Sequence, residues 1–189
     1  MYRSALAYAI PLVAVTTMSA PCASAQQFQA KFSGFNEVGA LNAETGAILS
    51  AGQGTLILQL NQQAQSLTYT LTYSNPSTPT WVVQQAHIHF GKIHVPGGIM
   101  VFLCTNLGNG PAGTPSCPSP SAAGANAVTG MLTPASVQAV PGQNISAGDF
   151  AALTAALLSD TAYGNIHTAS FPRGEIRGEI RRPERDDDR

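Results

Sequence analysis

The sequence predicts an all-β domain, an antiparallel Greek-key sandwich or barrel with one short amphipathic helix over about residues 147–158. Most of the chain consists of short segments in which apolar and polar residues alternate, separated by clusters of Gly, Pro, Asn and Ser. One segment only, residues 146–160, breaks this period of two. Many short strands with a single helix are typical of a sandwich or a barrel.

The clearest alternation lies in residues 66–74, SLTYTLTYS, where Leu and Tyr lie on one face and Thr on the other. Residues 53–60 alternate in the same way, and the short polar segment between the two predicts a hairpin. Further strands are expected at 28–35, 82–90, 99–103, 127–133, 164–168 and 174–181. The Gly/Pro-rich stretch 105–126 is long enough to be a functional or disordered loop.

The segment SAGDFAALTAALLSD is rich in alanine and leucine and has a helical period. Phe150, Leu153 and Leu157 occupy positions i, i+3 and i+7, and Asp149 favours the first turn. We expect this helix to lie across an open end of the β structure.

The first 25 residues have the pattern of a secretory signal peptide. Arg3 precedes a mostly apolar run at 5–17, and the segment ends in a small-residue cleavage site, ASA. The run is too short to span a membrane, and no later segment is apolar enough to do so. We therefore expect a secreted or periplasmic protein with one β domain at 26–181 and a charged, disordered tail at 182–189.

Charged residues are concentrated at one end of the chain. Of the 19 acidic and basic residues, 12 lie in residues 173–189, and Lys92 is the only one between Glu44 and Asp149. The sequence therefore has no basic face for nucleic acid, and too few carboxylates for a calcium or magnesium site.

Two cysteines, Cys104 and Cys117, remain once the signal peptide is removed. A pair in an exported protein favours a disulfide, whereas a zinc site needs more thiolates. The disulfide would restrain the Gly/Pro-rich loop between them.

The segment AHIHFGKIH, residues 86–94, carries three of the four histidines. In a strand, His87 and His89 lie on one face with Cα atoms about 6–7 Å apart, a separation that one copper or zinc ion can bridge. A third ligand could be His94 or His167. The alternative is a polar strand face whose imidazoles bind neighbouring carbonyl or carboxylate groups.

The repeat GEIRGEIR, residues 174–181, places Glu175, Arg177, Glu179 and Arg181 on one face of a strand. These residues could form a charge ladder at a sheet edge. Alternatively, Glu175 or Arg177 is a partner that orients a metal-binding histidine without contacting the metal itself. The sequence has no G-x-S-x-G motif, and no Asp lies near the histidines along the chain. No catalytic residues are predicted.

Two of these motifs together resemble the chordin (CHRD) domain family. They are AHIHFG at 86–91 and FAALTAALLSDTAYGNIHTASFPRGEIRGEI at 150–180, and residues 33–60 resemble the entry to that domain. The chain departs from the family pattern at Gly39-Ala40, where prolines are usual, and in the loop at 104–126 with its cysteine pair. The resemblance implies an extracellular binding or structural module rather than an enzyme of known reaction. The family motif includes positions that match His87, His89, His167, Glu175 and Arg177 of this chain, and it does not include His94.

A second resemblance is to copper–zinc superoxide dismutases, which also have an H-x-H strand in a Greek-key sandwich. Four histidines are too few for their two-metal site, whereas a copper-only site at His87, His89 and His167 remains open. The first hypothesis is therefore a non-catalytic exported module whose partner is an extracellular protein, a polysaccharide or a metal ion. The alternative is a copper or zinc protein, which in its copper-only form would be redox-active. Neither hypothesis includes a nucleic-acid partner.

Overall fold

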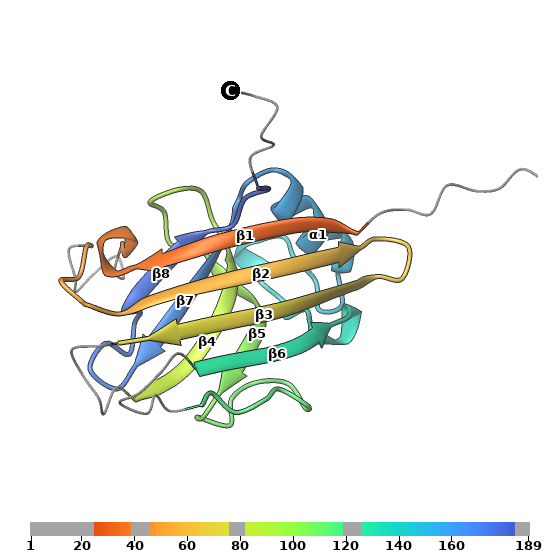
Figure 1. The fold of residues 1–189 in the computed structure, drawn as a ribbon. Helices are drawn as coiled ribbons and strands as arrows, with labels where there is room; N and C mark the ends of the chain where they lie inside the picture. Colours follow the sequence, from red (N-terminus) through yellow and green to blue (C-terminus); the bar gives the residue numbers. More distant parts are fainter. Residues whose placement is uncertain (1–24, 39–45, 76–81, 119–125, 184–189) are drawn as a thin grey trace, which may run out of the picture.

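The computed structural model describes residues 25–38, 46–75, 82–118 and 126–183 (Figure 1). The expected signal peptide, apart from Ala25, lies outside these residues. So do most of the expected tail and residues 119–125 of the long loop. Within the described ranges, no helix has the length and apolar character needed to cross a membrane.

Eight strands form one antiparallel sheet that curls into a nearly closed barrel (Figure 1). The strands are β1 (Gln26–Ser33), β2 (Gln53–Asn61), β3 (Ser66–Ser74), β4 (Val83–Phe90), β5 (Gly98–Thr105), β6 (Asn126–Leu132), β7 (Ala162–Thr168) and β8 (Ile176–Glu179). Their order in the sheet is β5-β4-β7-β8-β1-β2-β3-β6. The Tyr69 hydroxyl of β3, the strand next to the edge strand β6, donates a hydrogen bond to the Leu103 carbonyl of the other edge strand, β5, 2.6 Å away. The predicted all-β fold is confirmed.

The alternating segments form strands because one face of each can be buried in the barrel. The Leu residues of β2 and the Leu and Tyr residues of β3 are buried, and the polar residues between them lie outside. Burying each of these large side chains stabilises the fold by about 1.5–3 kcal/mol. The predicted hairpin between the two strands is present, with Gln65 at a positive φ of 45° in its turn.

The helix α1 (Phe150–Leu158) begins about three residues later than the sequence predicts. Gly148 has a φ of +82°, which is outside the helical region, and Asp149 is the N-cap, accepting a hydrogen bond from the Ala152 amide at 2.9 Å. The helix buries Phe150 and Leu153, among others, in the core. Three short 3-10 helices occur at Gly34–Asn36, Pro134–Ser136 and Pro141–Gln143.

The predicted disulfide is present. Cys104, near the end of β5, bonds to Cys117, and their Cα atoms are 5.0 Å apart. The Asn106 side chain donates to the Cys117 carbonyl and accepts from the Cys117 amide, so the loop is held by polar contacts as well as by the covalent bond.

The edge-strand interpretation of the GEIRGEIR repeat is wrong. β8 pairs with β7 on one side and with β1 on the other, so it lies inside the sheet. Arg177 is completely buried, because loops cover the outer face of β4, β7 and β8. A strand in this position needs no charges to prevent edge-to-edge association, and its charged side chains must have another role.

Candidate metal centre

Three histidines gather on the outer face of two neighbouring strands. β4 and β7 pair antiparallel, with His87 opposite Asn165 and His167 opposite Gln85. Ile88 and Ile166 point into the core, so the alternating side chains of both strands point to the other face. The exposed fractions of His87, His89 and His167 are only 0%, 8% and 7%. The structure therefore brings the H-x-H pair and His167 into one buried cluster.

The distances within this cluster suit a shared ion. One ring nitrogen from each histidine can be chosen so that all three lie within 4.8 Å of one another. Nδ1 of His87 is 3.2 Å from Nε2 of His167. His94 does not join them: it is exposed, in the loop that follows β4, at a φ of 57°.

Backbone carbonyls determine which ring nitrogen carries the proton in His89 and His167, and Nε2 of His167 accepts a hydrogen bond from Nδ1 of His87. Nδ1 of His89 is 3.0 Å from the Gly97 carbonyl oxygen, and Nδ1 of His167 is 3.1 Å from that of Pro172. Because a carbonyl oxygen only accepts, both Nδ1 atoms must carry the proton, which leaves a lone pair on Nε2 of each ring. Nε2 of His87 and Nε2 of His89 are both buried, and neither has a hydrogen-bond partner among the described residues.

Burial keeps all three imidazoles neutral. Loss of hydration lowers the pKa of His87 to about 2, with a further lowering from His167 and His89. The same loss lowers the pKa of His89 to about 3, although its bond to Gly97 acts in the opposite direction. Loss of hydration lowers the pKa of His167 to about 4, although the hydrogen bond to Pro172 raises it. Neutral imidazole is the form that binds metal ions.

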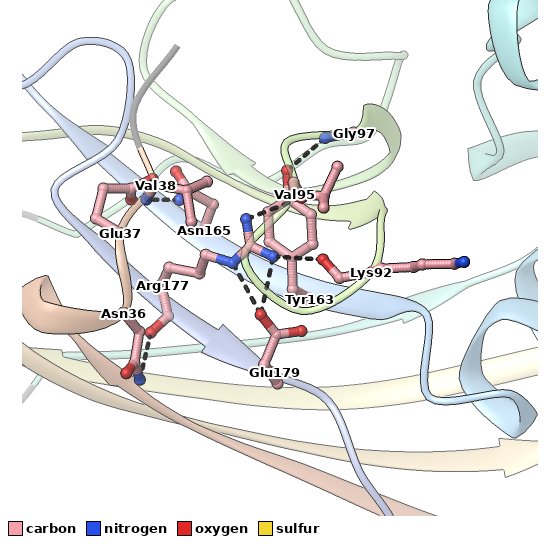
Figure 2. Close-up of polar contacts among 10 residues, drawn as sticks. All are labelled: Asn36, Glu37, Val38, Lys92, Val95, Gly97, Tyr163, Asn165, Arg177 and Glu179. Atoms are coloured by element: carbon pink, nitrogen blue, oxygen red, sulfur yellow. Dashed lines mark hydrogen bonds and ion pairs between the residues drawn. The ribbon is translucent and has the colours of Figure 1, made fainter. Parts of the chain in front are cut away.

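Two charged residues of the GEIRGEIR repeat contact the loops beside the histidines. Glu175 accepts hydrogen bonds from the hydroxyls of Ser50 and Thr168, and Thr168 begins the turn that contains Pro172. Arg177 donates to the carbonyls of Lys92 and Val95, in the loop that follows β4 (Figure 2).

The motifs of the sequence do not single out Tyr163, whose ring stacks on the His89 imidazole with centroids 4.8 Å apart. Nor do they single out Asn165, which donates to the buried carboxylate of Glu37 at 2.6 Å. Tyr163, Asn165 and His167 are two residues apart in the sequence, so the period of a strand places all three on one face. That signal could have found the first two.

Buried, neutral imidazoles are side chains of the kind that copper and zinc take as ligands. Among the described residues, no other group of three or more His, Cys, Asp or Glu side chains is placed to hold a metal ion.

Comparison with family models matches residues 28–180 to the CHRD domain family. The match spans the barrel from β1 to the end of β8 and includes all three histidines. The searches of curated proteins and of solved structures gave no match.

Proposed function

The chain belongs to the CHRD domain family, and from this premise we propose that it is an exported, non-catalytic module whose barrel binds one copper or zinc ion. The ligands in this proposal are His87, His89 and His167. The observation that carries it is the unpartnered Nε2 of His89, buried in a cluster of neutral imidazoles. A buried polar atom without a partner costs about 1–3 kcal/mol, and a bound metal ion would remove that cost.

The geometry of the cluster supports one shared ion. With bonds of about 2.0–2.1 Å from metal to nitrogen, the 3.2 Å between His87 Nδ1 and His167 Nε2 corresponds to an angle of about 100° at the metal. That angle is close to tetrahedral. His87 would bind through Nδ1, with its proton on the buried Nε2, and the other two histidines would bind through Nε2.

Glu175 and Arg177 act on the histidines through hydrogen bonds to neighbouring residues and loops in this proposal. Neither would bind the metal. Each would stabilise a loop whose backbone carbonyl orients one histidine: Pro172 for His167 and Gly97 for His89. Such partners fix the tautomer of a ligating histidine and raise its affinity.

Export is supported by the disulfide and by the residues that precede the barrel. A structural disulfide such as Cys104–Cys117 persists in oxidising compartments. Residues 1–25 have the pattern of a cleaved secretory signal. We therefore place the protein outside the cytoplasm, secreted or periplasmic.

Metal analysis tests the proposal directly. The purified protein is incubated with copper or zinc and dialysed, and its metal content is measured by mass spectrometry. We expect about one ion per chain, and a loss of well over half of it in His87→Ala, His89→Ala and His167→Ala. The matched control is His94→Ala, which removes an exposed imidazole from the adjacent loop and should leave the content unchanged.

Circular dichroism of each variant separates loss of a ligand from loss of the fold. Absence of bound metal in the wild-type protein would disprove the proposal. Unchanged metal content in the folded His87→Ala variant would move the site elsewhere in the chain.

A further inference from the structure

We propose that Tyr163, Arg177 and Gly97 form a clasp that closes the loop 91–97 over the candidate metal centre and couples loop closure to metal binding. The inference rests on the proposed function and adds its regulation. In this proposal Tyr163 and Arg177 are positioning residues, since they act on the metal through His89.

Gly97 is the point at which the loop meets the site. Its N–H donates to the Tyr163 hydroxyl at 2.9 Å, and its carbonyl accepts from Nδ1 of His89 at 3.0 Å. One peptide segment therefore links a tyrosine of β7 to a candidate ligand of β4. A Cβ atom at Gly97 would lie 1.7 Å from the Phe90 carbonyl oxygen, so a side chain here would displace the loop.

Arg177 binds the other part of the loop through two of the loop's backbone carbonyls. Its guanidinium donates to the Lys92 carbonyl at 3.1 Å and to the Val95 carbonyl at 3.2 Å (Figure 2). Two further bonds, at 3.0 and 2.8 Å, go to one carboxylate oxygen of Glu179. The side chains of the loop contribute little to its closure, because Ile93 and Val95 are 44% and 48% exposed.

Tyr163 lies in contact with both Arg177, which binds the loop, and His89. Its ring stacks on His89, nearly parallel at 6°, and the central carbon of the Arg177 guanidinium lies 3.4 Å from the ring centroid. β7 lies between β4 and β8, so Tyr163 lies between the histidine and the arginine. A cation–π contact that is buried in this way is stronger than one at an exposed site.

The clasp selects the nitrogen that His89 offers to a metal. With the Gly97 carbonyl in place, the proton stays on Nδ1 and Nε2 is the ligand atom. With the loop open, His89 loses this partner and both tautomers become accessible. Losing such a partner weakens metal binding about 10- to 100-fold. Coupling between two sites is reciprocal, so a bound metal must favour the closed loop by the same factor.

The test compares Tyr163→Phe and Arg177→Met with a matched control, Tyr69→Phe. The control also removes a buried tyrosine hydroxyl that binds backbone, the carbonyl of Leu103, and leaves the loop and the three histidines untouched. Zinc affinity is measured by competition with a chelator. The His89 tautomer in the metal-free protein is read from long-range ¹H–¹⁵N spectra, and amide hydrogen exchange reports on the loop.

We expect Tyr163→Phe and Arg177→Met to bind zinc at least tenfold more weakly than the wild type, and Tyr69→Phe to bind as the wild type does. His89 should carry its proton on Nδ1 in the wild type and in Tyr69→Phe, and should populate both tautomers in the two clasp variants. Zinc should slow amide exchange in residues 91–97 of the wild type at least tenfold, and should do so less in Arg177→Met.

The possible failures are distinguishable. A wild-type protein that binds no zinc overturns both the proposed function and the clasp. Zinc binding that depends on the three histidines but is as tight in the clasp variants as in Tyr69→Phe overturns the clasp alone. If Arg177→Met does not fold, Tyr163→Phe decides, because it keeps the ring and removes only the hydroxyl.

Discussion

The buried histidines should make the metal-free protein sensitive to mild acid. The pKa values of His87, His89 and His167 in the fold are lowered to about 2, 3 and 4, whereas an unfolded histidine titrates near 6.5. Well above pH 6.5 these side chains are neutral in both states and do not make stability depend on pH. Below it the unfolded chain binds up to three protons that the folded chain does not, so stability falls as the pH falls.

The size of the effect follows from these pKa values. Between pH 7 and pH 5, each histidine should lower the free energy of unfolding by about 2 kcal/mol, and the three together by about 6 kcal/mol. Domains of this size are stable by about 5–15 kcal/mol, so the loss is a large fraction of the total. The range from pH 7 to pH 5 lies above the ordinary pKa values of Asp and Glu, so the carboxylates contribute little to the change.

Urea unfolding of the metal-free protein at pH 7, 6 and 5, in the presence of a chelator, measures this loss. His87→Asn should remove about a third of the pH dependence, because one proton fewer is bound on unfolding. The control His94→Gln, at an exposed position outside the cluster, should keep the wild-type dependence. Equal unfolding free energies at pH 7 and pH 5, or a dependence that His87→Asn leaves unchanged, would refute the reasoning.

Three further predictions concern stability. Replacing Cys104 and Cys117 by serine should lower the free energy of unfolding by about 3 kcal/mol, because the disulfide closes a loop with a sequence separation of 13 and restricts the unfolded chain. Gly164→Ala should cost about 1–3 kcal/mol, because its Cβ would lie 2.4 Å from Cζ of Phe32 in the core. Asp149→Ala should cost about 1 kcal/mol through loss of the N-cap of α1. Urea unfolding at pH 7 measures all three.

Each of these variants has its own control. Gly142→Ala places a Cβ atom where no atom from a more distant part of the described chain lies within 4 Å, so it should be nearly neutral. A loss as large as that of Gly164→Ala would contradict the packing explanation. For the cysteine variant, wild-type protein treated with a reductant should show the same loss of stability. Asp149→Asn keeps a capping oxygen and should recover most of the loss, and no recovery would argue against the cap.

Local patterns predicted most strands, because burial on one face of a strand repeats every two residues. The alternation in residues 53–60 and 66–74 gives β2, β3 and their hairpin, and the helical period of residues 146–160 gives α1 with its start displaced. The repeat at 174–181 predicts a strand at a sheet edge, whereas the strand β8 covers only Ile176–Glu179 and lies inside the sheet. Its charges made it look exposed, whereas loops from distant parts of the chain bury them.

The sequence by itself determined the all-β class, the family, the shared face of His87 and His89, and the pairing of the two cysteines in the barrel. These follow from local periodicity, from motifs and from the presence of only two cysteines after residue 25. Only the tertiary structure decided that β7 lies beside β4, which brings His167 to 3.2 Å from His87 across 80 residues of chain. It alone decided that the buried Arg177 binds a loop more than 80 residues away. Such contacts depend on strand order and on the paths of loops, which no short-range pattern of polar and apolar residues encodes.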